Sequence, residues 1–158
     1  MLINKSILWV ALLTVHTITY ASFPRGCEVT GFGYYGTNLV VNDKGGQTFY
    51  LIQNRSDHAI ELRRVETEDV FMSPSLTAKI DAKYWAAFAS DVQNLNFQCF
   101  SVKDNATSPV DCRDVLDVCQ YPRVKFALSN MGNYWVAVNN SQRTVINEAT
   151  AKGIYLRW

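Results

Sequence analysis

The chain has 158 residues, of which 48% are hydrophobic and 13% aromatic, and its formal net charge at pH 7 is +1. Such a balanced charge gives no electrostatic reason to expect contact with nucleic acid or with an anionic membrane surface. The length suits a single domain with a substantial core, and the aromatic content favours β-sheet.

Residues 1–21 have the pattern of a secretory signal peptide. One positive charge, Lys5, precedes an apolar stretch over residues 7–15, and small residues up to Ala21 are typical of a cleavage site. The apolar stretch is much shorter than the roughly 20 residues that span a bilayer, so an uncleaved anchor is the weaker alternative. We therefore expect a neutral, exported single domain over residues 22–158, periplasmic or secreted, with no stable membrane span after cleavage.

All four cysteines, Cys27, Cys99, Cys112 and Cys119, lie in the exported part. An even number in an oxidising compartment indicates two disulfides, and three pairings are possible. We favour Cys27–Cys99 with Cys112–Cys119, because the second pair closes a short loop and leaves the two strand cysteines for each other. Zinc is the alternative, but the chain has no Cys-x-x-Cys pair and His58 has no partner at ligand spacing. The sequence thus predicts no metal or other cofactor.

The exported chain begins with short strands separated by turns. Residues 27–35 alternate between two faces, with glycines that indicate a bulge or a close approach of the backbone. Residues 42–46 tolerate positive φ and indicate a hairpin loop. Residues 48–52 and 59–63 predict two strands joined as a hairpin. A surface connection is expected over residues 65–75.

The pattern is ambiguous over residues 76–89 and clearest over residues 94–102. Four alanines in the first segment favour a helix by propensity, whereas its second half also fits a strand, which we predict. In the second segment, apolar Leu95, Phe97 and Cys99 alternate strictly with polar residues. This segment is therefore expected to be a strand with one dry and one wet face, at the centre of the fold.

The rest of the chain returns to the strand pattern after a loop. Residues 104–109 indicate a loop by composition, and residues 111–117 an acidic helical turn. Calcium is a weaker interpretation of that turn, because its spacing departs from that of calcium loops. Alternation resumes over residues 123–128 and 134–138 and closes the chain at residues 154–158. About seven to nine short strands predict an all-β, antiparallel β-sandwich, Ig-like or similar, with a closed barrel as the alternative.

The sequence contains no catalytic motif, so we expect a protein that is not an enzyme. A hydrolytic triad would need His58, which lies in a polar turn after Ser56 and Asp57. A hydrolase with an unrecognised pair of carboxylates stays the alternative. The possible members of such a pair are Glu61, Glu66, Glu68, Asp69 and Asp91.

Aromatic residues near turns are the strongest indication of binding. Tyr34, Tyr35 and Trp135 lie beside glycine or asparagine turns, where rings tend to be presented. We predict that they contact a protein partner, in the cell envelope or on a host surface. A glycan is the alternative partner, in which case the protein would be a carbohydrate-binding module.

Three acceptor patterns for N-linked glycans begin at Asn54, Asn105 and Asn139. All three fall in predicted turns, which implies that the asparagines are exposed. They matter only in a eukaryotic secretory pathway.

Four stretches in the middle of the chain are distinctive: residues 46–54 (GQTFYLIQN), 71–74 (FMSP) and 85–91 (WAAFASD), the last running into 97–99 (FQC). Together they resemble the exported enhanced entry protein B family of Legionella and Coxiella relatives. The resemblance implies a periplasmic or secreted protein of a Gram-negative bacterium, associated with entry into host cells. It covers the middle half of the exported chain and carries over no catalytic residues.

Overall fold

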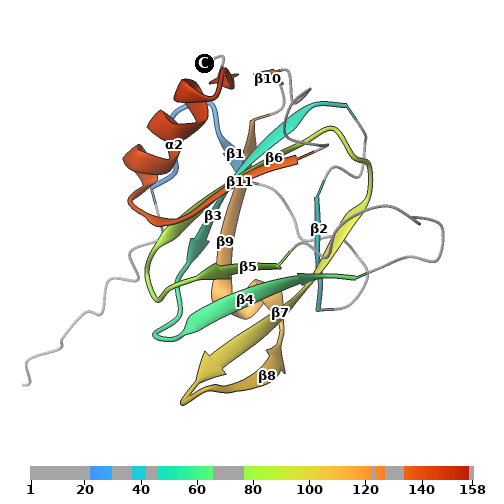
Figure 1. Ribbon diagram of the computed structural model, residues 1–158, viewed down its shortest axis with the longest axis vertical. Coiled ribbons are helices and arrows are strands. Elements are labelled where there is room, and N and C mark those ends of the chain that lie inside the picture. The colour runs from blue at the N-terminus through green and yellow to red at the C-terminus, as the bar shows by residue number, and fades with distance from the viewer. Residues whose placement is uncertain are drawn as a thin grey trace, which may run out of the picture.

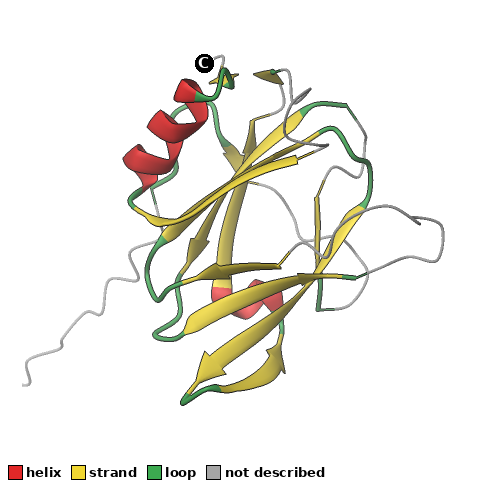
Figure 2. Ribbon diagram, in the orientation of Figure 1, coloured by secondary structure: helices red, strands yellow, loops and turns green. Residues whose placement is uncertain are grey.

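The computed structural model describes six stretches of the chain: residues 22–29, 37–41, 46–65, 77–121, 124–126 and 134–156. The predicted signal peptide, residues 1–21, and the predicted contact residues Tyr34 and Tyr35 lie outside them. Within these stretches most of the regular structure is β-strand (Figure 2). No helix there is long and apolar enough to cross a membrane.

The strands form two antiparallel five-stranded sheets and one two-stranded sheet (Figure 1). Sheet A has the order β1-β9-β3-β6-β11, and sheet B has the order β2-β7-β4-β5, with β8 paired to the second half of β7. Sheet A consists of β1 (Glu28–Val29), β9 (Leu116–Tyr121), β3 (Thr48–Asn54), β6 (Trp85–Ser90) and β11 (Tyr134–Asn140). Sheet B consists of β2 (Leu39–Val41), β7 (Leu95–Lys103), β4 (Ala59–Arg64), β5 (Thr77–Ile80) and β8 (Ala106–Val110).

Apolar side chains from both sheets form the inner core, and the predicted antiparallel β-sandwich is confirmed. Sheet B supplies alternate residues of its strands, such as Ile60, Leu62 and Phe97. Sheet A supplies Tyr50 and Phe88 to the same cluster. Burying one face of each sheet in this way is what holds a sandwich together.

Sheet A is buried on its other face as well. A second apolar cluster, called here the outer cluster, lies there under the helix α2 (Gln142–Ala151), which contacts β6 and β11 (Figure 1). The short strands β10 (Val124–Lys125) and β12 (Tyr155–Leu156) pair with each other and add Val124 and Leu156 to this cluster. Its fully buried members include Phe49, Leu51, Ala87, Ala89, Cys119, Tyr121, Val145, Ala149 and Ile154.

Burial on both faces explains the ambiguous pattern of residues 76–89. In β6, Ala86 and Phe88 face the inner core, while Ala87 and Ala89 face the outer cluster. A strand buried on both sides reads as a continuous apolar run without alternation. The strand predicted for the second half of this segment is confirmed over Trp85–Ser90.

The helix α2 was not predicted from the sequence, although its signals are present. The hydroxyl oxygen of Ser141 accepts a hydrogen bond from the backbone N–H of Thr144 (3.2 Å), as an N-cap residue does. Val145 and Ala149, four residues apart, lie on one face of the helix and are fully buried. Gly153, with φ +81°, then ends the helix and turns the chain back.

The predicted hairpin between residues 48–52 and 59–63 is wrong. Both strands exist, but β3 belongs to sheet A and β4 to sheet B. The intervening turn therefore carries the chain from one layer to the other. The loop predicted at residues 42–46 lies mostly outside the described residues, and it likewise connects strands of different sheets, β2 and β3.

The predicted loop over residues 104–109 is a tight turn followed by a strand. Asp104 and Asn105 both have positive φ, 49° and 63°, which is the conformation of the two-residue turn that joins twisted strands. The strand β8 then pairs with β7 from Lys103↔Ala106 to Cys99↔Val110. Pro109 lies in this edge strand, where it provides no backbone donor.

Two disulfides are present, but the favoured pairing is wrong. The bonds are Cys27–Cys119 and Cys99–Cys112, with Cα–Cα distances of 5.5 Å and 5.3 Å. Cys112 lies in the inner core with Cys99, whereas Cys119 points from β9 into the outer cluster. Cys112 and Cys119 are thus on opposite faces of sheet A and cannot meet.

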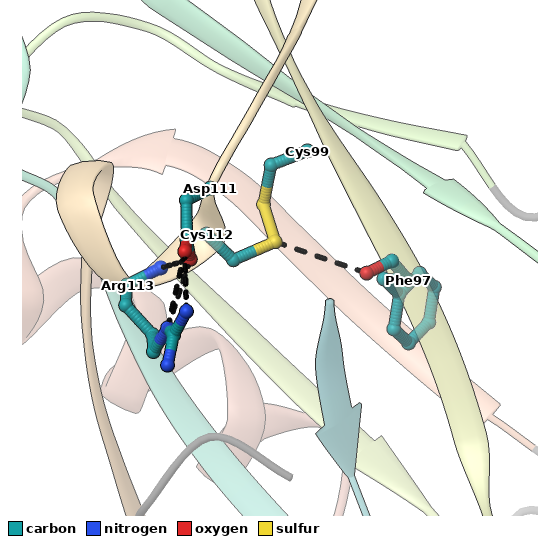
Figure 3. The surroundings of a disulfide bond; sticks show 5 residues. All are labelled: Phe97, Cys99, Asp111, Cys112 and Arg113. Atoms are coloured by element: carbon teal, nitrogen blue, oxygen red, sulfur yellow. Dashed lines mark hydrogen bonds and ion pairs between the residues drawn. A yellow bond between two sulfur atoms is a disulfide. The ribbon is translucent and has the colours of Figure 1, made fainter. Parts of the chain in front are cut away.

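Each disulfide joins segments that the sheets already bring together. The strand β1 runs along β9 with Val29 opposite Cys119, which places Cys27 next to it. The strand β8 leads back from the end of β7 to α1 (Cys112–Val115), so Cys112 returns to Cys99. Figure 3 shows this second bond, with the sulfur of Cys112 3.8 Å from the carbonyl oxygen of Phe97.

Candidate interaction surface

Trp135, one of the predicted contact residues, is only 8% exposed, so its predicted surface position is wrong. It lies in β11 opposite Ala89 and belongs to the outer cluster. Alternation along β11 sends Trp135 and Ala137 toward this cluster and Val136 and Val138 toward the inner core. A ring so enclosed contributes to packing and is not available to a partner.

The outward side of sheet B carries a partly exposed aromatic residue that the sequence analysis missed. Phe100 follows the buried Cys99 in β7, and alternation directs it away from the core, where it is half-buried. Its neighbours across the strands are Glu61 on β4 and Pro109 on β8. We call this surface the Phe100 face; its outward residues are Ala59, Glu61, Arg63, Thr77, Lys79, Gln98, Phe100, Val102, Thr107 and Pro109.

Contacts among three side chains hold the centre of the Phe100 face in place. The guanidinium carbon of Arg63 lies 4.2 Å from the centre of the Phe100 ring. The Nε of the same arginine donates to Oε1 of Glu61 at 2.6 Å. At exposed sites such cation–π and ion-pair contacts stabilise by about 1 kcal/mol or less each. Their consequence is therefore a defined orientation of the guanidinium, more than a gain in stability.

One end of the sandwich is held by the buried side chain of Asn54. Its amide nitrogen donates to the carbonyl oxygens of His58 (2.7 Å), Ile80 (2.9 Å) and Asp81 (3.1 Å), and its oxygen accepts from Ser56. These bonds join the turn after β3 to the turn after β5, and so tie the two sheets together. Asn54 is 0% exposed, so the expectation that it is an accessible glycan acceptor is wrong.

The other two acceptor patterns differ in exposure. Asn105 lies at the exposed tip of the β7–β8 hairpin, as expected. Asn139 lies in β11 and not in a turn, and its side-chain oxygen accepts a hydrogen bond from the backbone N–H of Asp81 at 2.7 Å. Of these two asparagines, only Asn105 therefore lies exposed in a turn, as the sequence implied.

Acidic residues at the end of the sandwich near Asn54 form ion pairs on the surface. The side-chain hydrogen bond from Lys83 lowers the pKa of Asp57. The side-chain hydrogen bond between Arg113 and Asp111 lowers the pKa of Asp111 and raises the pKa of Arg113 (Figure 3). All three groups stay charged over the physiological range. Because these pairs are exposed to solvent, they contribute little to stability.

The acidic helical turn predicted at residues 111–117 is confirmed only over α1, which has Asp111 as its N-cap, because Asp117 lies in the strand β9. Arg55 lies over it, and donates from Nε to the carbonyl oxygen of Asp114 (3.1 Å) and from Nη1 to Asp117 (3.4 Å). Among the described residues, no three His, Cys, Asp or Glu side chains are grouped as metal ligands. The side chains of Asp111 and Asp117 are engaged by Arg113 and Arg55.

The described residues do not assemble a hydrolytic site around His58. Ser56 contacts it only through the backbone of His58, because its hydroxyl donates to the carbonyl oxygen (2.8 Å) and accepts from the N–H (3.4 Å). Glu61 lies on the Phe100 face, and Asp91 lies in the connection between β6 and β7. The remaining candidates, Glu66, Glu68 and Asp69, lie outside the described residues.

A void of about 10 Å³ lies between the sheets, which is roughly the space of one water molecule. It is lined by Val41, Ile52, Leu62, Ala78, Ala86, Phe88, Phe97 and Val136. This apolar void is a packing defect of the inner core.

The fold and its surface define a disulfide-bonded β-sandwich with one face covered by a helix and the opposite face exposed. A scan against models of known protein families finds no match, and neither the known curated proteins nor the solved structures contain a chain similar to this one.

Proposed function

We propose that the protein is an exported, non-enzymatic interaction protein that contacts a protein partner through the Phe100 face. The observation that carries the proposal is the partly exposed ring of Phe100 on the outward side of a sheet, where Arg63 and Glu61 hold its surroundings. Aromatic and arginine side chains in ordered positions are what protein contacts use most. The two disulfides fit an oxidising compartment.

The resemblance to the enhanced entry protein B family supports a location in the periplasm or outside a Gram-negative cell. In that setting the partner is a protein of the bacterial envelope or of the host-cell surface. We propose this setting together with the contact face, and the two parts can be tested separately.

A protein partner is better supported than a glycan. Carbohydrate-binding surfaces stack sugar rings on open aromatic faces, whereas one face of Phe100 is occupied by the guanidinium of Arg63. The most exposed tyrosines among the described residues, Tyr84 (49%) and Tyr155 (64%), lie on separate elements, the turn after β5 and the strand β12. They do not extend the Phe100 face into a line of rings.

A photo-crosslinking experiment tests the contact face. The photoreactive amino acid p-benzoylphenylalanine is placed at Gln98, on the Phe100 face, or at Tyr155, on the strand β12, and the oxidised protein is incubated with bacterial envelope and host-membrane extracts. We expect a discrete crosslinked partner from Gln98, and its loss when Phe100→Ala is added.

Tyr155 is the matched control because it is also exposed but lies outside the Phe100 face. Crosslinks to the same partner from both positions, or from Tyr155 alone, would contradict the proposal. Thermal unfolding of each variant checks that the fold is unchanged.

A further inference from the structure

The guanidinium of Arg63 is held in place but only partly used. Its Nε donates to Glu61 and its plane lies near the ring of Phe100, while its side chain is 41% exposed. Among the described residues, Nη1 and Nη2 of Arg63 have no hydrogen-bond partner. The two terminal nitrogens of an arginine form a planar fork that matches the two oxygens of a carboxylate.

A second cation lies on the same face. Lys79 on β5 is opposite Glu61 on β4 and is exposed. Its ammonium forms no ion pair with the carboxylates of the described residues, and Glu61 is already engaged by Arg63. The Phe100 face therefore has a net positive charge, with donors that face solvent.

The cations at the end of the sandwich show the opposite arrangement. There, Arg55 is paired with Asp117, Lys83 with Asp57, and the third cation, Arg113, with its neighbouring Asp111. Those pairs satisfy the charges within the molecule. The free donors of the Phe100 face thus differ from the paired cations at this end of the sandwich.

We propose that the partner of the Phe100 face is an acidic polypeptide segment. One carboxylate binds the Nη1–Nη2 fork of Arg63, a second lies near Lys79, and an apolar side chain of the segment packs on Phe100 and Val102. Apolar residues next to the cations fit an acidic peptide better than a sulfated glycan, which has little apolar surface to bury. This inference rests on the proposed function and specifies the chemistry of the partner.

Selection from a displayed library of random heptapeptides on the oxidised protein tests the inference. We expect the enriched peptides to contain aspartate or glutamate next to an apolar residue. For a synthetic peptide of the enriched sequence, Arg63→Gln should weaken binding about tenfold or more, and Arg63→Lys by a smaller factor because the fork is lost but the charge remains. Raising the salt concentration should also weaken binding.

The matched control is Lys125→Gln, because Lys125 is an exposed cation on β10, outside the Phe100 face. Its affinity for the peptide should equal that of the wild type. Thermal unfolding of Lys125→Gln should match that of the wild type, and that of the Arg63 variants should change only slightly, because Arg63 makes two surface contacts of about 1 kcal/mol or less each.

Three outcomes would overturn the inference or the contact face, and they are distinguishable. Enriched peptides that lack acidic residues but lose affinity with Phe100→Ala would overturn the acidic partner and leave the contact face standing. Peptides whose affinity is insensitive to both Phe100→Ala and Arg63→Gln would overturn the contact face itself. Retention on heparin with no peptide enriched above background would replace the polypeptide by an anionic glycan and so overturn the inference.

Discussion

The two outward faces of the sandwich are built from the same kind of strand, but one is covered by other elements and the other is open to solvent. On sheet A, the outward residues Phe49, Leu51 and Tyr121 are fully buried beneath α2 and its neighbours. On sheet B, the outward residues Arg63 and Phe100 stay partly exposed. The difference teaches that the covered face serves the stability of the fold, while the open face is available for contact.

The amino-acid sequence records this difference in its periodicity. The strand β3 of sheet A is apolar at consecutive positions, whereas β5 of sheet B alternates strictly between exposed and buried residues. A strand covered on both faces loses its alternation, and a strand covered on one face keeps it. The comparison can be tested by variants that affect one face and spare the other.

The largest effect is expected from the disulfide of the covered face. Cys27–Cys119 closes a sequence separation of 92 residues and Cys99–Cys112 one of 13. In the chain-entropy model, removing the first lowers the free energy of unfolding by about 4 to 5 kcal/mol and removing the second by about 3 kcal/mol. Urea unfolding of the two double-alanine variants measures both, and a larger loss for the Cys99/Cys112 variant would contradict the expected order.

Truncating one aromatic residue on each face should separate stability from contact. Trp135→Ala removes a buried ring from the outer cluster and should lower the free energy of unfolding by about 3 to 5 kcal/mol. Phe100→Ala removes a half-buried ring and should lower it by about 1 kcal/mol or less. Urea unfolding monitored by far-UV circular dichroism compares them, and equal losses would mean that the Phe100 face belongs to the core.

A smaller effect is expected from alkaline pH, through a tyrosine of the covered face. Burial raises the pKa of Tyr121 from 10.0 to about 12. Because its phenol stays neutral in the folded protein where that of the unfolded chain ionises, the free energy of unfolding is constant below pH 10 and falls as pH approaches 12. The loss is about 2 to 3 kcal/mol at most.

Tyr121→Phe keeps the buried ring and removes the titrating group. Urea unfolding between about pH 8 and pH 12 should therefore show a shallower alkaline decline in this variant than in the wild type. Identical declines in the two proteins would show that Tyr121 is not the group responsible.

The sequence predicted best the strands that have one wet face. The alternation of Leu95, Phe97 and Cys99 correctly located β7, because a period of two is visible only when one side of a strand meets water. The same pattern placed Phe100 on the wet face, and this was the available signal for the contact surface. A search for aromatic residues near turns selected Trp135 instead, which the fold buries.

Features that depend on the partners of a strand could not be predicted from local patterns. The cysteine pairing required knowing that β9 directs Cys119 and Val118 to opposite faces, and that β1 lies along β9. The division of β3 and β4 between two sheets is equally non-local, because a short polar turn fits both a hairpin and a crossing. Local rules fix the strands, and the packing of distant segments fixes their neighbours.

The proline in the edge strand β8 affects the tendency of the protein to aggregate. A strand with a free edge can seed the addition of strands from other molecules, which leads to fibrils. Pro109 interrupts the row of backbone donors along that edge, next to Phe100 on the neighbouring strand. We therefore expect that molecules at high concentration do not add strands to one another along β8, although the partly exposed Phe100 lies next to this edge.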